Sequence, residues 1–343
     1  MNWKIHLTME ESVKFIPLTF ALLFTICCQA GKADADGSSD TLTFIHVTDP
    51  HVCNLTGYQP FFTEKRKHFG NNAEPLSQFL KTVPKQRKSD LVIITGDNID
   101  YYEAETETGA MLDTQIEQYA RLIEVSEIPV YLTLGNHDLA SYSVNAGSTQ
   151  ILNNQFNAVR ARAAWSRNAP CFKDGTYYSR VFEVEKTTIR FIFLDNGYYA
   201  TEEVSDGLLP FIVDQPQLRW LDAQLKASDS DIEIIFMHMP LNYGKMEANK
   251  VLTEPISKYS AQGKYYNLFN VLEKNSSIRV LFAGHKHINS INNYTLQDGK
   301  KLTQVMTGAF GYDTANWRLV KLTKNNIIIC FPNSSKPEYI IEL

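Results

Sequence analysis

The stretch DLVIITGDNID, residues 90–100, carries the pattern from which the fold is predicted. Its aliphatic run, LVII, is typical of a buried strand, and the run stops at Gly96 and Asp97. Four other stretches also place Asp, Asn or His after an apolar run: FIHVTD, PVYLTLGNHD, IEIIFMH and IRVLFAGHKH. Because the carboxyl ends of parallel strands share one edge of a sheet, we expect these polar residues on a common rim.

The sequence around this stretch predicts strands that alternate with helices. We expect a strand at 42–48, a helix at 74–86, a strand at 90–95, a helix at 113–125 and a strand at 129–134. In a βαβαβ pattern of this kind the strands are parallel and the crossovers are right-handed.

The remainder of the chain adds further strands and helices to this unit. We predict a helix at 151–164, strands within TYYSRVFEVE and TTIRFIFLD, a helix at PQLRWLDAQLKA, a strand at 232–237, a helix at 261–274, a strand at 278–283 and a mostly β C-terminal third. Two sheets with helices outside them accommodate all of these elements. The predicted fold class is therefore α/β, a two-sheet β-sandwich flanked by helices.

Length and composition are those of one substantial domain. The chain has 343 residues, of which 44% are hydrophobic, enough for one large domain or two small ones. It contains no heptads, no repeat of solenoid length and no low-complexity linker after the N-terminal region, so we expect a single domain over 41–343. The net charge of −5, with both signs mixed, does not indicate a nucleic-acid partner. The oligomeric state is left undetermined.

The N-terminus has the pattern of an export signal. The apolar run FIPLTFALLFTICC, residues 15–28, has the length of a signal-peptide core and is short for a membrane-spanning helix. We expect a signal peptide or lipoprotein leader at 1–30, a flexible mature start at 31–40 and no transmembrane segment beyond the leader. Export places the protein in the periplasm, outside the cell or, through a lipid on Cys27 or Cys28, at the cell surface. A buried N-terminal helix is the alternative.

Two of the polar motifs have a spacing that suits metal binding. Asp49 and His51 are separated by one residue, and so are His285 and His287. In an extended segment, residues two apart point to the same side, so each pair is expected to reach a single ion.

The types of donor in these motifs suggest which ions are bound. The carboxylate of Asp97 has two oxygens and is able to bridge two cations, whereas Asn136 offers a neutral amide oxygen that limits the negative charge. Imidazole nitrogens mixed with carboxylate oxygens suit Zn²⁺, Mn²⁺ or Fe²⁺ better than Ca²⁺. The sequence therefore predicts two divalent metal ions.

The order of the motifs, D-x-H, G-D, G-N-H-D, H and G-H-x-H, resembles that of the calcineurin-like metallophosphoesterases over roughly residues 42–290. The resemblance implies the four-layer fold of that family and a dimetal centre. It implies one metal held by Asp49, His51, Asp97 and His287, and a second held by Asp97, Asn136, His238 and His285.

The same resemblance implies catalytic residues beside the metals. It leaves His137 off the metals, as a general acid beside the leaving-group oxygen. Asp138 or Asp100 is then expected to orient the imidazole of His137, and the alternative for these carboxylates is a turn or a helix cap.

We therefore expect an exported phosphoesterase that hydrolyses phosphate mono- or diesters by attack of a metal-bridging hydroxide. The motifs distinguish it from purple acid phosphatases, which have D-x-G at the first motif, and from protein serine/threonine phosphatases, which carry an arginine after G-D-x-x-D. They are most similar to the cyclic-nucleotide phosphodiesterase-like and broad phosphoesterase enzymes. A small phosphate ester is the expected substrate. The alternatives are a nuclease or sphingomyelinase-like phosphodiesterase, and a non-catalytic surface binding protein on the same scaffold.

Substrate preference is expected to reside in the loops after the strands, at 52–72, 139–150 and 197–216. Their aromatic residues are candidates for stacking on a substrate ring, or for packing within the loops themselves: Phe61, Phe62, Tyr198 and Tyr199. The basic run of Lys65, Arg66 and Lys67 is interpreted as a solvated face or a phosphate contact. We interpret His46 as a core residue and the Cys53 thiol as a bystander near the metal site.

Overall fold

The computed structural model describes residues 40–145, 148–152, 155–197, 213–241, 248, 250–255, 268–275, 277–296, 298–334 and 336–343. The predicted leader at 1–30 and the predicted flexible start, except Asp40, lie outside the described residues. Within the described ranges, no helix is both long and apolar enough to cross a membrane.

The first sheet contains the parallel strands that the sequence predicts. Its order is β17-β16-β15-β1-β2-β5. β1, β2 and β5 are parallel, β15 pairs antiparallel with β1, and β16 and β17 each pair antiparallel with the strand before them. The strands are β1 (Leu42–Val47), β2 (Leu91–Thr95), β5 (Val130–Thr133), β15 (Trp317–Leu322), β16 (Asn326–Cys330) and β17 (Tyr339–Glu342). β1 and β2 are buried along their whole length, which explains why they read as continuous apolar runs.

The second sheet has the order β11-β13-β14-β12-β10-β9-β8. Its centre is parallel, with β10 lying between β9 and β12, and β8 pairs antiparallel with β9. The strands are β8 (Tyr178–Val184), β9 (Thr187–Phe193), β10 (Ile232–Phe236), β11 (Val251–Pro255), β12 (Ile278–Ala283), β13 (Ser290–Thr295) and β14 (Lys301–Met306). The central strands therefore deliver two further strand ends, those of β10 and β12, to the same edge.

A layer of phenylalanine rings joins the two sheets. Phe44 of β1 makes edge contacts with Phe191, Phe236 and Phe282 of the second sheet, at ring-centroid distances of 5.4–5.6 Å. All four side chains are fully buried. Burying such rings between the two sheets stabilises the fold and packs the sheets face to face.

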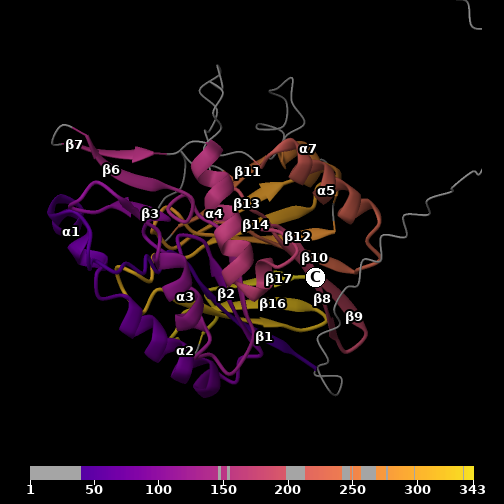
Figure 1. Cartoon of the computed structure of the whole chain (residues 1–343). Helices are drawn as coiled ribbons and strands as arrows, with labels where there is room; N and C mark the ends of the chain where they lie inside the picture. Colours follow the sequence, from indigo (N-terminus) through magenta and orange to yellow (C-terminus); the bar gives the residue numbers. More distant parts are fainter. Residues whose placement is uncertain are drawn as a thin grey trace, which may run out of the picture. The chain divides into compact units, whose positions relative to one another are not determined.

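Helices cover the outer faces of this sandwich. The bounds are α2 (Ala73–Arg87), α3 (Gln115–Ile123), α4 (Gln155–Asn168), η2 (Pro170–Phe172), α5 (Gln215–Lys226) and α7 (Leu268–Lys274). Figure 1 shows α2 and α3 on one side and α5 and α7 on the other. In α5, the predicted apolar face of Leu218, Leu221 and Leu225 is buried against the second sheet with α7. The predicted two-sheet α/β fold with outer helices is confirmed.

A small third sheet, of order β4-β3-β6-β7, was not predicted. It consists of β3 (Glu103–Glu105), β4 (Met111–Leu112), β6 (Ser141–Asn145) and β7 (Ser148–Leu152). With α1 (Pro60–Arg66) and η1 (Lys67–Phe69) it surrounds a separate apolar cluster that contains Phe62 and Tyr101. The helix expected at 151–164 begins only at Gln155, because β7 occupies the residues up to Leu152. Most of the helix expected at 261–274 lies outside the described residues, which contain only its end in α7.

Candidate metal centre

The predicted metal-binding residues lie on one rim to which both sheets contribute. The first sheet supplies Asp49 and His51 after β1, Asp97 after β2 and Asn136 after β5, and the second supplies His238 after β10 and His285 and His287 after β12. Backbone hydrogen bonds connect the neighbouring loops, from Asp49 N to Gly96 O at 3.1 Å and from His51 N to Asp97 O at 2.9 Å. Backbone hydrogen bonds alone therefore fix the positions of these loops relative to each other.

The backbone at this rim is left-handed, which corrects the extended geometry expected for the D-x-H and H-x-H pairs. The angle φ is positive at Asp49 (51°), His51 (46°), Asp97 (46°), His285 (69°) and His287 (55°). Side chains with a Cβ rarely adopt this region, and residues that do are concentrated at functional sites. Here the left-handed residues turn each loop sharply over its strand end, so the side chains converge through turns rather than through extended alternation.

The glycines of these motifs are required by close approach between loops. A Cβ on Gly96 would lie 2.6 Å from the ring of His238, and a Cβ on Gly135 would lie 2.2 Å from the carboxylate of Asp97. Both distances are far shorter than any van der Waals contact. The G-D and G-N-H motifs therefore contain glycine because the polar side chains pack directly against its backbone.

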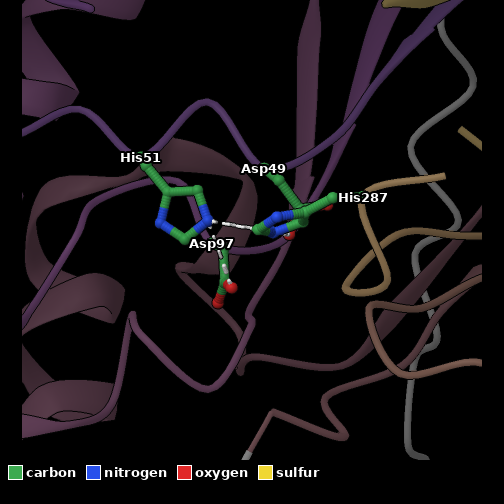
Figure 2. A group of neighbouring side chains, drawn as sticks. All are labelled: Asp49, His51, Asp97 and His287. Carbon is green, nitrogen blue, oxygen red and sulfur yellow. Dashed lines mark hydrogen bonds and ion pairs between the residues drawn. The ribbon is translucent and has the colours of Figure 1, made fainter. Parts of the chain in front are cut away.

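The first set of side chains, which we name the outer group, consists of Asp49, His51, Asp97 and His287 (Figure 2). One potential ligand atom from each lies within 4.8 Å of the others. His287 Nε2 is 3.1 Å from Asp49 Oδ1 and 3.4 Å from His51 Nε2, and His51 Nε2 is 3.6 Å from Asp97 Oδ2.

The second set, which we name the inner group, consists of Asp97, Asn136, His238 and His285. His238 Nε2 lies 3.2 Å from Asp97 Oδ2, 3.3 Å from Asn136 Oδ1 and 3.3 Å from His285 Nδ1. The other nitrogen of His238, Nδ1, donates to the carbonyl of Thr95 at 2.9 Å. In the neutral ring this bond leaves the lone pair on Nε2, and that tautomer is able to bind a metal.

The chemistry of these donors fits a pair of cations. Asp49 and Asp97 are fully buried, and in the part of the chain that the structure describes only histidines lie within ion-pair distance of them. Burial favours the neutral carboxyl, but the charge of His238 and the hydrogen bond from His287 hold the pKa of Asp49 at about 2. Two buried carboxylates ringed by imidazole nitrogens require positive charge, and divalent metals supply it.

His137 lies beside both groups and is a member of neither, although it forms a third set of potential ligand atoms with His51 and Asp100, all within 4.8 Å of one another. Its backbone N–H donates to Asp97 Oδ1 at 2.9 Å, and its ring Nδ1 donates to the carbonyl of Asp100 at 2.6 Å. Burial lowers the pKa of His137, but the charges of Asp97 and Asp100 outweigh that effect and raise the pKa to about 9. The ring therefore has its Nε2 free of these bonds, as the predicted acid role requires.

Asp100 is the carboxylate that contacts His137, and it connects this residue to an arginine that the sequence did not reveal. Asp100 Oδ1 lies 3.4 Å from His137 Nδ1 and 3.4 Å from His51 Nδ1. Arg66 binds Asp100 with both Nε, at 2.6 Å, and Nη2. The Arg66 side chain is only 14% exposed, so the basic run 65–67 is not wholly a solvated face. Arg66 is 34 residues from Asp100, and no local pattern in the sequence indicates this pair.

Asp138 does not orient His137, contrary to one of the expectations. Its oxygens accept hydrogen bonds from Gly135 N at 2.7 Å, Ile99 N at 3.0 Å and Asn98 Nδ2 at 2.9 Å. The carboxylate of Asp138 therefore bonds to the turn after β5 and to the neighbouring loop. The structure thus favours the alternative that Asp138 is a turn residue.

Asn196 is a further residue at the site that the sequence did not assign. Its Oδ1 accepts from His238 N at 3.1 Å and from Met239 N at 3.0 Å, and its Nδ2 donates to Met239 O at 2.9 Å. The preceding Asp195 is fixed through its backbone by Gln217 of α5. The LDN sequence and the QLRWLDAQL helix therefore position the loop that carries His238.

The remaining candidates fall into three classes. Phe62 is buried in the core of the small sheet, whereas Phe61 is exposed, and Tyr198 and Tyr199 lie outside the described residues. His46 is fully buried between Thr95 and Thr307, as expected of a core residue. Cys53 is buried in the apolar cluster of the small sheet, and burial raises the pKa of its thiol, in line with the expected bystander. The three cysteines among the described residues are free: Cys53, Cys171 and Cys330.

Comparison with known families identifies this arrangement. The sequence profile described as calcineurin-like phosphoesterase matches residues 42–289, well over half of the chain. The chain belongs to the calcineurin-like phosphoesterase family. The predicted family is thereby confirmed, together with its mixed α/β fold and with the enzyme class, hydrolases that act on phosphoric esters. For a calcineurin-like phosphoesterase, the two groups of His and Asp side chains indicate a binuclear metal site.

Several solved structures are similar to this calcineurin-like phosphoesterase. A dimetal phosphatase from Danio rerio is 16% identical, with 84% of this chain and 95% of that one covered and a TM-score of 0.48. GAP50, the anchor in the inner membrane complex of Plasmodium, is 15% identical, with 88% of each chain covered and a TM-score of 0.49. The purple acid phosphatase PPD1 from yellow lupin is 14% identical, with 85% of this chain and 51% of that one covered and a TM-score of 0.46. A search of curated proteins gives no match.

Proposed function

We propose that this protein hydrolyses small phosphate mono- or diesters at the centre formed by the outer and inner groups. The observation that carries the proposal is the position of Asp97, which contributes to both groups while its second oxygen accepts from the backbone of His137. A single buried carboxylate thus connects two candidate metal positions and a candidate acid.

The residues that would hold the metals are those of the two groups, with Asp97 shared between them. Two bound divalent cations supply an activated water and offset the negative charge of the phosphoryl group. Six of the seven donors are carboxylates or imidazoles, and the seventh is the amide of Asn136. This donor set favours Mn²⁺, Zn²⁺ or Fe²⁺.

His137 is proposed as the general acid. Its Nδ1 is occupied by the Asp100 carbonyl, and its side chain is 19% exposed, so Nε2 is the nitrogen available to a bound ester. A proton delivered from Nε2 to the leaving oxygen avoids the release of an alkoxide, which matters most for alkyl esters. Asp100 positions the ring and is itself held by Arg66.

The test is a substrate screen after reconstitution with Mn²⁺, Zn²⁺ or Fe²⁺. The panel contains aryl and alkyl monoesters, diesters, cyclic nucleotides, DNA and phospholipid headgroups. Hydrolysis of small esters with two metals per chain is the expected result. Preferential cleavage of DNA or of phosphocholine lipids would replace the proposal with the nuclease or sphingomyelinase-like alternative. Absence of both metal binding and hydrolysis would favour the non-catalytic binding protein.

We also propose that the protein is exported. The support is the apolar run at 15–28 with small residues after it, a region that lies outside the described residues. Cell fractionation combined with N-terminal sequencing and mass measurement of the mature protein tests this. A new N-terminus near residue 30 is expected, with added lipid mass if a cysteine is the anchor. An intact N-terminus on cytoplasmic protein would contradict export.

A further inference from the structure

An exposed tyrosine borders the outer group, in a part of the chain that the family match does not reach. Tyr312 follows β14, beyond the end of the match at residue 289, and its side chain is 60% exposed. Its ring centroid lies 5.0 Å from that of His287, in an edge arrangement. An exposed aromatic ring therefore lies beside the candidate centre.

Tyr312 belongs to a small aromatic cluster at this border. Its ring lies 5.2 Å from that of Phe69, and it is nearly parallel to the ring of His68, with 8° between the planes and 6.1 Å between centroids. Phe69 is buried and stacks on His51, with centroids 4.4 Å apart. His68 is exposed, as Tyr312 is. We name the exposed pair, His68 and Tyr312, the aromatic rim.

The loop that carries Tyr312 is fixed to the first metal-binding loop. Gly311 N donates to Asp49 O at 3.0 Å, and Phe310 N donates to Thr48 O at 3.0 Å. The side-chain amide of Asn72 donates to both Gly311 O, at 3.2 Å, and Pro50 O, at 3.1 Å. A Cβ on residue 311 would lie 2.8 Å from Pro50 O, so glycine is needed for this close packing. The position of the Tyr312 ring is thus fixed relative to Asp49.

This anchoring separates Tyr312 from an ordinary exposed aromatic residue. A large apolar side chain on the surface is common and needs no explanation by itself. Phe61 on α1 is also exposed, at 45%, and no ring contact to a predicted metal-binding residue is found for it among the described residues. Tyr312 combines exposure with direct contact to His287 and with a rigid support. Those three properties are what a stacking surface for a substrate requires.

We infer that the aromatic rim binds the ring of an aromatic phosphate ester, an aryl or nucleoside phosphate, while its phosphoryl group occupies the metal centre. The inference rests on the proposed function and specifies the substrate class. Aromatic faces attract other aromatic rings through dispersion and quadrupole interactions, and they bind nucleobases with little sequence preference. An aliphatic ester gains nothing comparable from Tyr312. The protein therefore prefers aromatic over aliphatic esters of equal charge.

The test compares two variants of Tyr312, with Phe61→Leu as the control variant, on two pairs of compounds. Tyr312→Leu removes the ring and keeps apolar bulk, whereas Tyr312→Phe keeps the ring. Metal-loaded proteins are titrated with phenylphosphonate and ethylphosphonate, which are not hydrolysed, and assayed with phenyl phosphate and ethyl phosphate. Tyr312→Leu should weaken phenylphosphonate binding and raise KM for phenyl phosphate by about five- to tenfold. Both ethyl compounds should be unaffected, and Tyr312→Phe should resemble the wild type.

Three outcomes would overturn the inference: no change in Tyr312→Leu, an equal loss for phenyl and ethyl compounds, or the same selective loss in Phe61→Leu. Metal content and circular dichroism of each variant establish that the fold and the centre are intact. The titrations with phosphonates distinguish failure of this inference from failure of the proposed function. A wild type that discriminates the phosphonates through Tyr312 but hydrolyses no ester would refute the hydrolytic proposal alone. Hydrolysis without discrimination at Tyr312 would refute the inference alone.

Discussion

The outer and inner groups share Asp97 but differ in what surrounds them. In the inner group, His238 is completely buried. Its ring Nδ1 donates to the Thr95 carbonyl, and its backbone N–H donates to the side-chain oxygen of Asn196. In the outer group, the His287 side chain is 28% exposed and contacts the aromatic rim through Tyr312. Each group includes one partly exposed histidine, His285 in the inner group and His287 in the outer group, but the contact with the aromatic rim is made by the outer group.

This difference indicates a division of labour within one centre. The neighbours of the inner group come from strand ends and from the LDN loop, which Gln217 of α5 holds in place. The neighbours of the outer group, such as Arg66 and Phe69, come from the segment between β1 and α2. We therefore expect changes near the inner group to affect metal binding, and changes near the outer group to affect catalysis and substrate choice.

Asp97→Ala is expected to have the largest effect, because it removes the residue that the two groups share. Mutation of residues that only support a metal ligand already lowers metal affinity by about 10- to 100-fold. Removal of a shared ligand should therefore lower the affinity by more than about 100-fold at both metal positions. Metal content per chain after gel filtration, with hydrolysis of an aryl phosphate, measures this. Asp298→Ala, on the surface, is the control. Two tightly bound ions in Asp97→Ala would refute the shared role.

His137→Ala should retain both metals and lose turnover, because His137 belongs to neither group. Loss of a general acid typically lowers the rate by about 10²- to 10⁴-fold. The loss should be greatest for alkyl phosphates and smallest for nitrophenyl phosphate, whose leaving group needs no proton. Rates across a series of leaving groups provide the measurement. An equal decrease in rate for every leaving group would show that His137 is not the general acid.

Arg66→Met should destabilise the protein and disturb the outer group. It leaves Asp100 fully buried without its bidentate partner, and breaking a buried ion pair in this way costs about 3 kcal/mol. Urea unfolding and turnover are measured together with metal content. Arg66→Met combined with Asp100→Asn should regain part of the unfolding free energy, because the orphaned charge is removed. A single variant as stable as the wild type would show that the pair is dispensable.

Asn196→Ala should act on the inner group alone. It leaves the N–H groups of His238 and Met239 unpaired, at a cost of about 1–3 kcal/mol, and frees the loop that carries His238. We expect weaker binding of one of the two metals and little change in the preference among esters. Calorimetric metal titration is the measurement, and Asn333→Ala, an exposed site, is the control. Altered ester preference with normal metal affinity would contradict the division between the groups.

The smallest expected effect is a pH dependence from His46, a histidine of the core and not of the centre. Burial and the charge of Arg318 lower the pKa of His46 to about 3, against about 6.5 in an unfolded chain. Between these values the unfolded state binds a proton that the folded state does not. The unfolding free energy should therefore fall with decreasing pH below 6.5, by up to about 1.4 kcal/mol per pH unit.

His46→Gln tests this, because it removes the titrating group. Urea unfolding at pH 7.0 and at pH 5.5 should show a shallower decrease in the variant than in the wild type, with metal content unchanged at pH 7.0. An identical decrease in both proteins would assign the pH dependence to other groups.

The candidate metal-binding residues could be predicted because each motif is local and ends a strand. Asp49, Asp97 and His238 occupy strand ends that periodicity alone locates, and parallel pairing brings such ends to one edge. The two-sheet architecture followed from the same runs. The residues that support the centre could not be predicted in this way. Arg66 meets Asp100 across 34 positions, and Asn196 meets His238 across 42.

Other features escaped prediction because their signal is weak or distant. The small sheet contains strands of two and three residues, such as β3 and β4, which are too short for an alternating pattern. Tyr312 lies 25 residues after His287, and their rings meet because the loop at Phe310 and Gly311 is hydrogen-bonded to the loop that carries Asp49. Left-handed backbone at Asp or His leaves no mark in the sequence, because neither residue type requires it.

That left-handed backbone has an evolutionary consequence. A side chain with a Cβ held at φ near 50° costs about 1 kcal/mol relative to glycine, and five of the predicted metal-binding residues are in this state. Each replacement of such a residue by glycine relaxes the main chain and removes a donor at the same step. Selection for folding stability alone would therefore favour loss of these donors while the fold itself is retained. The five left-handed residues therefore lower main-chain stability in exchange for their predicted role as metal donors.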